Sequence, residues 1–167
     1  MEDMKLKNRN PCVAGVFYNG EKELLKKQIS WCFLHKVGPR ILPSGIVKNE
    51  REVISLISPH AGYIYSGPVA AHGYYYISRE PIPEVVVIIG PNHTGIGAGI
   101  AIWCEGEWIT PLGKVEVDSE LANMLIREGV AEKDETAHIY EHSIEVQIPF
   151  LQFIYQNKFK ILPICML

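Results

Sequence analysis

The stretch EVVVIIGPNH, residues 84–93, decides the fold. Residues 85–89 are a continuous apolar run without the polar–apolar alternation of a half-buried strand, and glycine and proline follow this run. Such a run is typical of a strand that helices cover on both faces, as in a parallel sheet. A similar stretch precedes it, because residues 53–60 read VISLISPH. Each apolar segment therefore ends in a small residue and a proline, and His60 or His93 follows within two residues.

The residues between these two predicted strands favour a helix over Gly67–Ile77, with Pro68 in its first turn. Strand, helix and strand in this order indicate a βαβ unit with parallel strands. The carboxyl ends of parallel strands lie at one edge of a sheet, where open α/β sheets bind their ligands. We therefore expect His60 and His93 to face one crevice. Two neutral imidazoles are a common start of a transition-metal site, and the alternative is that each histidine only hydrogen-bonds within its own turn.

A second cluster of chemically active residues reads DETAHIYEHSIE and ends at Glu145. A helix predicted from Glu141 onward places Glu141, His142 and Glu145 on one face, because residues three or four apart are neighbours on a helix. A histidine beside carboxylates suits proton transfer, which makes these three the candidate catalytic residues, or it suits a third metal ligand with an orienting partner. The alternative for the two glutamates is an exposed helix face, and for His138 it is a solvated loop position.

Tyr63 and Asn92 lie in the two histidine loops. They are the candidates for contacting a small-molecule or peptide ligand, with core packing as the alternative for Tyr63.

Helical and strand patterns alternate along the rest of the chain, which indicates an α/β fold with a mostly parallel or mixed sheet and helices on both faces. A length of 167 residues suits one domain. Asp118 is a predicted helix cap, and Pro149 is expected to kink the helix over residues 141–155. Further helices are predicted over residues 19–36 and 119–128, and strands over residues 99–103, 113–117 and 159–167.

Composition excludes several classes of protein. A net charge of −3 argues against a strongly electrostatic nucleic-acid binder. The longest apolar runs, at 85–89 and 161–167, are far shorter than the roughly 20 residues of a membrane helix. The N-terminal stretch MEDMKLKNRN lacks the apolar segment of a signal peptide. The four cysteines form no C-x-x-C pair, so we expect reduced thiols in a cytoplasmic protein.

Five motifs, in this order along essentially the whole chain, resemble the MEMO1 family, also called AmmeMemoRadiSam system protein B. This resemblance implies a fold like that of the class III extradiol dioxygenases, which are non-haem iron enzymes that open catechol rings. The motifs are VAGVFY at residues 13–18, SPHAGYIYSG at 58–67, GPNH at 90–93, TPLG at 110–113 and EHSIEVQIPF at 141–150.

The resemblance also implies roles for particular residues. His60 and His93 match the family's metal-binding histidines, whereas Glu141 and His142 match its acid–histidine motif beside that site. The implied cofactor is Fe(II) or copper, and the implied chemistry is redox chemistry. The alternative is a binding module for phosphotyrosine or another anionic group in the same crevice, as described for an animal member.

Family members continue beyond the region matched here, into a part that carries a cysteine of the metal site. We therefore expect this chain to correspond to about the N-terminal three-fifths of a member and to lack a complete site. A separately encoded C-terminal half or a homo-oligomer is the expected partner. The final strand, at residues 159–167, would then have an unpaired edge.

Overall fold

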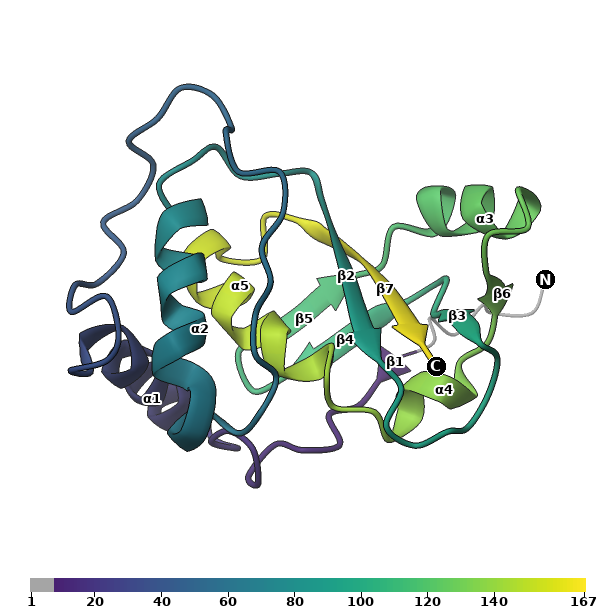
Figure 1. Cartoon of the computed structure of the whole chain (residues 1–167), viewed down its shortest axis with the longest axis horizontal. Helices are drawn as coiled ribbons and strands as arrows, with labels where there is room; N and C mark the ends of the chain where they lie inside the picture. The colour runs from purple at the N-terminus through teal and green to yellow at the C-terminus, as the bar shows by residue number, and fades with distance from the viewer. Residues whose placement is uncertain (1–7) are drawn as a thin grey trace.

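The apolar run at residues 84–93 forms β2 (Val85–Pro91), the first strand of a mixed four-stranded sheet with the order β2-β7-β3-β6 (Figure 1). The computed structural model describes residues 8–167. The first seven residues, which belong to the stretch expected to lack a signal peptide, lie outside the described residues. β2 runs parallel to β7, and β3 is antiparallel to β7. The other strands of this sheet are β7 (Lys160–Met166), β3 (Ile100–Ile102) and β6 (Glu132–Lys133).

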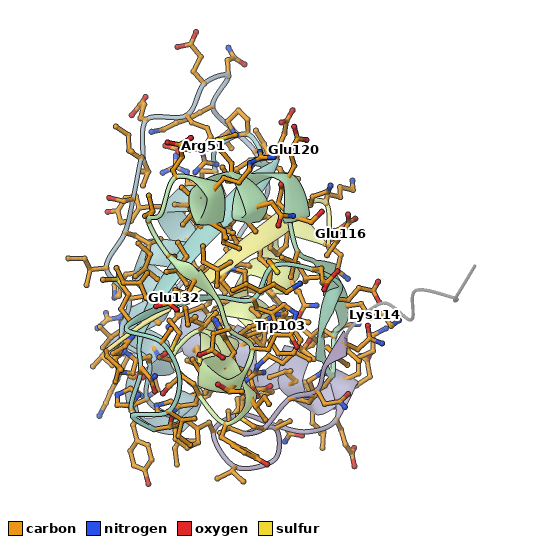
Figure 2. The ribbon with its side chains drawn as sticks, turned by 90° about the vertical axis from the view of Figure 1, so that its right-hand side faces the viewer. Arg51, Trp103, Lys114, Glu116, Glu120 and Glu132 are labelled. Atoms are coloured by element: carbon orange, nitrogen blue, oxygen red, sulfur yellow. The ribbon has the colours of Figure 1, made fainter. Side chains whose placement is uncertain are left out.

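A smaller sheet with the order β1-β4-β5 stands beside the large one. Its strands are β1 (Asn8–Arg9), β4 (Glu107–Thr110) and β5 (Gly113–Glu116). Seen from the side that carries α3, the charged groups of Lys114, Glu116 and Glu120 project outward and Trp103 lies inside (Figure 2). Lys114 is paired with Glu107 at 2.7 Å.

Helices lie on both faces of the large sheet, so the predicted α/β class is confirmed. One face packs its side chains into a core shared with α1, α2 and α5, and the opposite face packs against α3. Asp118 caps α3 as predicted, because its carboxylate accepts the N–H of Leu121 at 2.9 Å. The helices are α1 (Lys22–Leu34), α2 (Tyr63–Ile77), α3 (Ser119–Arg127), α4 (Thr136–Ile139) and α5 (Ile148–Tyr155), and the 3-10 helix η1 spans Glu145–Gln147.

The predicted strand at residues 53–57 is wrong. The segment is extended but pairs with no strand among residues 8–167, so the βαβ unit predicted over residues 53–89 is absent. It packs on α2 instead, where the side chain of Leu56 lies against Gly73. A groove separates the segment from β2.

The helix predicted over residues 67–77 begins a turn earlier, at Tyr63. The N–H of Tyr63 donates to the carbonyl of Phe17 at 2.7 Å, which fixes the first turn against the N-terminal segment. Pro68 therefore lies inside α2 and not at its start.

The predicted helix over residues 141–155 is also wrong in its first half. Residues 141–144 form a turn, η1 follows, and only α5 is α-helical. Pro149 lies in the first turn of α5, where its missing N–H removes no helical hydrogen bond, so it produces no kink.

Two expectations about strand burial need correction. β2 is covered on one face only, because Val87 and Ile89 are 50% and 62% exposed on the other, beyond the reach of α3. β7 has no open edge, since it lies between β2 and β3. The edges of this sheet belong to its two end strands, β2 and β6. No helix within residues 8–167 has the length and apolar character needed to cross a membrane.

His138 is a core residue and not the solvated loop residue that we considered from sequence. Its side chain is fully buried in α4, and its Nε2 lies 3.2 Å from the carbonyl oxygen of Ala101. The rings of Trp103 and Trp108 stand edge-on to it, with centroids at 6.3 and 5.7 Å. Burial lowers the pKa of His138 from 6.5 to about 4, so the folded protein holds it neutral at physiological pH.

This burial predicts a loss of stability in acid. Below its ordinary pKa of 6.5 the imidazole takes up a proton in the unfolded chain, whereas the folded chain resists protonation until about pH 4. The free energy of unfolding should therefore fall by about 3 kcal/mol between pH 6.5 and pH 4 on account of this residue. Urea unfolding across this range should show a shallower pH dependence in His138→Gln than in the parent or in a variant of the exposed His72. An unchanged pH dependence in His138→Gln would contradict the assignment.

Candidate metal centre

Three histidines from separate segments meet at one end of the large sheet. His60 ends the extended segment beside α2, His93 follows β2, and His142 lies in the turn before η1. One ring nitrogen from each lies within 4.8 Å of the others. The ring centroids of His93 and His142 are 4.6 Å apart, and that of His60 is 5.1 Å from His93. His60 and His93 thus face one crevice, although the strand pairing expected to bring them there is absent among the described residues.

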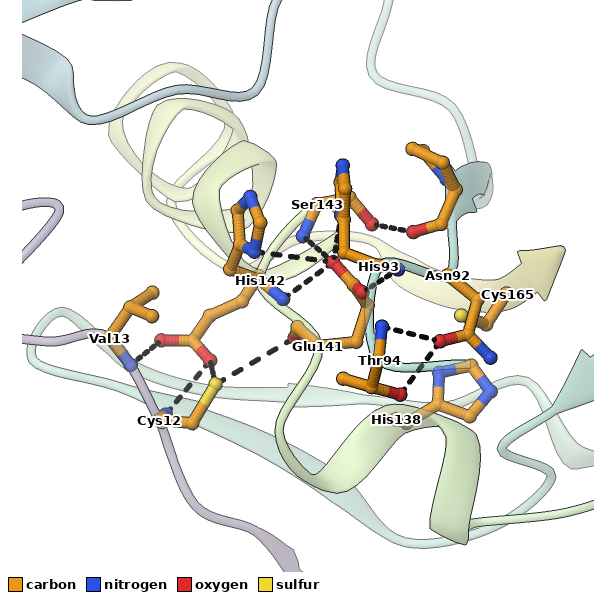
Figure 3. Close-up of polar contacts among 12 residues, drawn as sticks. Cys12, Val13, Asn92, His93, Thr94, His138, Glu141, His142, Ser143 and Cys165 are labelled. Atoms are coloured by element: carbon orange, nitrogen blue, oxygen red, sulfur yellow. Dashed lines mark hydrogen bonds and ion pairs between the residues drawn. The ribbon is translucent and has the colours of Figure 1, made fainter. Parts of the chain in front are cut away.

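The carboxylate of Glu141 orients His93 (Figure 3). It accepts the backbone N–H of His93 at 2.5 Å and lies 2.9 Å from the Nδ1 atom of the same residue. Burial alone would raise the pKa of this carboxyl, but hydrogen bonds from His93 and Ser143 outweigh it and hold the pKa at about 2. An ionised acceptor requires the proton of neutral His93 to sit on Nδ1. The Nε2 lone pair of His93 is therefore free to bind a ligand.

The same carboxylate fixes the turn that carries His142. It accepts the backbone N–H groups of His142 and Ser143, both at 2.8 Å, and takes the place that helical carbonyls would have. The ring of His142 packs against Phe17 with centroids 4.7 Å apart. Burial lowers the pKa of His142, which favours the neutral imidazole that a metal ion requires.

Glu145, a predicted catalytic residue, forms its hydrogen bonds with the N-terminal segment of the chain. It is fully buried, and its carboxylate accepts the phenol O–H of Tyr18 at 2.7 Å and the guanidinium of Arg9 at 2.7 Å. The backbone N–H groups of Cys12 and Val13 donate to it as well. Within residues 8–167 none of its hydrogen bonds reaches the three histidines. A part in proton transfer stays a prediction, and the observed contacts are those of a structural ion pair.

Sequence reasoning missed Arg9, which is 2% exposed and binds the backbone of the segment that carries Glu141. Its guanidinium donates to the carbonyls of His138 at 2.9 Å and of Glu141 at 2.7 Å, and it lies over the Trp108 ring at 4.1 Å. A single arginine near a chain end carries no sequence signal of burial. The resemblance gave none either, because its first motif begins at Val13.

The two predicted substrate contacts are used elsewhere. Tyr63 is 2% exposed, and its hydroxyl donates to the carbonyl of Val146 at 2.7 Å, so it belongs to the core. The side-chain oxygen of Asn92 accepts from Thr94, and its amide nitrogen donates to the carbonyl of Ile96 at 2.8 Å. Asn92 therefore shapes the loop that carries His93.

A surface pocket of 740 Å³ opens beside His60 and His142. Its other lining residues are mainly apolar or aromatic: Val16, Phe17, Pro59, Ala61, Gly62 and Tyr65. A small organic ligand could reach the two imidazoles through this opening.

The donor set suits a transition-metal ion. Imidazole is a good ligand for iron, copper, zinc and nickel, and a carboxylate on the far ring nitrogen is the usual orienting partner of a metal-bound histidine. Neither ring nitrogen of His60 has a hydrogen-bond partner among the described residues, so either nitrogen can serve as the ligand atom, with the proton on the other. The thiol of Cys165 is buried in β7 near the carbonyl of Ala137, and burial raises its pKa to about 11.

Comparison with known proteins places these residues in context. The family model for Memo-like proteins matches residues 9–167. A MEMO1 family protein of Sulfurisphaera tokodaii is 55% identical over 158 residues, which cover 93% of this chain and 56% of the relative. MEMO1 family proteins of Saccharolobus solfataricus and Saccharolobus islandicus are 53% and 52% identical over the same coverage. The chain thus spans a little over half the length of the curated relatives that it matches.

Gly90 is predicted to be essential to this arrangement. A side-chain carbon at position 90 would come within 2.7 Å of Ile144 Cγ1 and would also meet the Ser143 hydroxyl. Gly90→Ala should therefore push the His142 turn away from β2 and lower the free energy of unfolding by about 1–3 kcal/mol in urea titrations. Gly99→Ala is the matched control, since that position has open space around it. Equal free energies of unfolding of the two variants would show that Ser143 and Ile144 leave room for a side chain at position 90.

Proposed function

The chain belongs to the Memo-like protein family, and on that premise we propose that it binds one redox-active transition-metal ion, Fe(II) or copper, through His60, His93 and His142. The observation that carries the proposal is the convergence of three imidazoles within 4.8 Å, one of them oriented by a buried carboxylate. The choice of iron or copper comes from the resemblance to the MEMO1 family and to the extradiol dioxygenases.

A bound ion of this kind would supply Lewis-acid polarisation and electron transfer to a ligand at its open positions. The protein's own part is to hold the histidine ligands in place and to orient their rings. Glu141 keeps the proton of His93 on Nδ1, and Phe17 shields one side of His142 from water. The apolar pocket beside His60 would admit a small organic molecule or a peptide side chain. The four free cysteines are in keeping with a cytoplasmic setting.

His142 could have one of two roles. As a third ligand it would hold the ion, whereas as a proton carrier beside Glu141 it would leave the ion to His60 and His93. The first is favoured because the pKa of His142 is lowered by burial and its ring stacks on that of His93.

An alternative is capture of an anionic group such as phosphotyrosine. It has less support, since neither lysine nor arginine is among the residues that line the pocket.

The direct test is metal binding by the purified chain. Titration with Fe(II) under anaerobic conditions, and with copper, should give one ion per chain. His60→Ala, His93→Ala and His142→Ala should each reduce the affinity by more than tenfold, whereas His72→Ala on the outside of α2 should leave it unchanged. Unaltered stoichiometry and affinity in all three variants would refute the proposal. Retention of affinity in His142→Ala alone would favour the proton-carrier role.

Glu141→Gln provides a second test. The amide keeps the shape of the side chain but is a weaker acceptor for the His93 N–H, so we expect a 10–100-fold loss of metal affinity. Phosphotyrosine titration of the metal-free chain completes the experiment. Tight binding there, together with no metal binding, would support the anionic-ligand alternative.

A further inference from the structure

Helix α1 carries large apolar side chains on both its inner and its outer face. The inner face is buried in the core, whereas Leu24, Trp31 and Leu34 on the outer face are 43%, 41% and 53% exposed. These three residues follow one another at intervals of seven and three, so they lie on one side of the helix. The outer face of a helix in a water-soluble protein is ordinarily polar or charged. α1 lies at the end of the molecule opposite α3 and β6 (Figure 1).

The segment that follows α1 continues this apolar surface. It folds back onto the end of the helix, because the N–H of Arg40 donates to the carbonyl of Phe33 at 2.8 Å. Its large apolar side chains are also 42–54% exposed, and they are Val37, Ile41 and Leu42. Apolar residues that are exposed one at a time are ordinary, whereas a group gathered on one element and its adjoining loop indicates an interaction surface.

The charge of this region is opposite in sign to that of the whole chain. Residues 24–48 contain five lysine or arginine residues and no aspartate or glutamate, although the chain has a net charge of −3. Two of the five are paired with glutamates outside the region. The other three, Lys27, Lys36 and Arg40, are exposed and form no ion pair within residues 8–167. We call these three cations and the six exposed apolar residues the α1 surface: Leu24, Lys27, Trp31, Leu34, Lys36, Val37, Arg40, Ile41 and Leu42.

We propose that the α1 surface binds to a lipid bilayer that carries anionic headgroups. The aliphatic and indole side chains would enter the boundary between headgroups and acyl chains, where indole rings are enriched. The lysine and arginine side chains would extend toward the headgroup phosphates. α1 would lie in the plane of the bilayer surface, in keeping with the finding that no helix of residues 8–167 is long and apolar enough to cross a membrane.

Other occupants match the α1 surface less well. Two copies of this chain placed face to face would bring unpaired cations opposite one another, which is unfavourable. A nucleic acid offers phosphates to the cations but no apolar layer for five aliphatic side chains. A bilayer with anionic lipid offers acyl chains and negative charge over one continuous area. It therefore satisfies both halves of the surface, and an acidic protein becomes an outcome that the experiment can detect.

The test measures binding of the 167-residue chain to vesicles of phosphatidylcholine, with and without phosphatidylglycerol. A chelator is present throughout, so the result does not depend on the proposed metal centre. The chain should float with the phosphatidylglycerol vesicles only, and binding should weaken as salt is raised. Trp31 is a built-in probe, because the other two tryptophans, Trp103 and Trp108, are 5% and 1% exposed. Binding should shift the tryptophan emission to shorter wavelength, and lipids with brominated acyl chains should quench it.

Charge variants test the electrostatic half of the proposal. Lys27→Gln combined with Lys36→Gln should weaken binding to the anionic vesicles about 20-fold, because two of the three unpaired cations are lost. Lys114→Gln combined with Lys133→Gln is the matched control. It removes the same charge from exposed positions on β5 and β6 and should bind like the parent.

Apolar variants test the other half. Leu24→Ser combined with Leu34→Ser should weaken binding at least tenfold, whereas Met124→Ser combined with Val130→Ser, at exposed positions on and after α3, should not. All four double variants change exposed positions, so their urea unfolding should match that of the parent.

The proposal is overturned if the chain does not float with anionic vesicles, if it binds both kinds of vesicle equally, or if either double variant of the α1 surface binds like its control. Polyglutamate in solution serves as the acidic competitor. Binding of polyglutamate that equals vesicle binding and persists in the apolar variant would assign the surface to an acidic protein, and would overturn the proposal as well.

Discussion

The buried carboxylate of Glu141 is the contact on which the histidine cluster depends. It binds the loop after β2 through His93 and the turn before η1 through His142 and Ser143, so it joins two segments that lie about fifty residues apart in sequence. Its charge is stabilised by these donors at any pH above about 2. A second buried acid, Glu145, ties the same turn to the N-terminal segment through Arg9 and Tyr18. His93 and His142 are therefore positioned by a network of ionic hydrogen bonds, and this network replaces the helix that we expected at residues 141–144.

Sequence reasoning succeeded where structure is set locally. The cap at Asp118, the helix predicted over residues 19–36 and the strands predicted from the apolar runs of β2 and β7 depend on neighbouring residues, and the structure confirms these elements. It failed where the conformation of a segment depends on contacts with residues far away in the sequence. Residues 53–57 have the composition of a strand but find no neighbour, and residues 141–144 have the spacing of a helix but are capped by a side chain.

The candidate site was predictable only where local sequence determines the position of a residue. His60 and His93 follow apolar runs that end in glycine, serine and proline, a local signal. Arg9 and the orienting role of Glu141 depend on contacts more than forty residues away in sequence, which no local pattern encodes. His138 was misjudged because its burial is produced by two tryptophans that lie about thirty residues away, Trp103 directly after β3 and Trp108 in β4.

The candidate metal centre lies at the end of the sheet where β2, an edge strand, finishes. His93, 45% exposed, follows directly from the strand whose edge is uncovered.

In the proposed metal centre, three histidines from separate segments surround a single ion. Crystals of the metal-loaded chain, measured at the absorption edge of the bound metal, test it most directly. We expect one anomalous peak about 2.0–2.2 Å from a nitrogen of each of His60, His93 and His142, with Nδ1 of His93 still hydrogen-bonded to Glu141. A peak bound by other residues, or by none of the three, would contradict it.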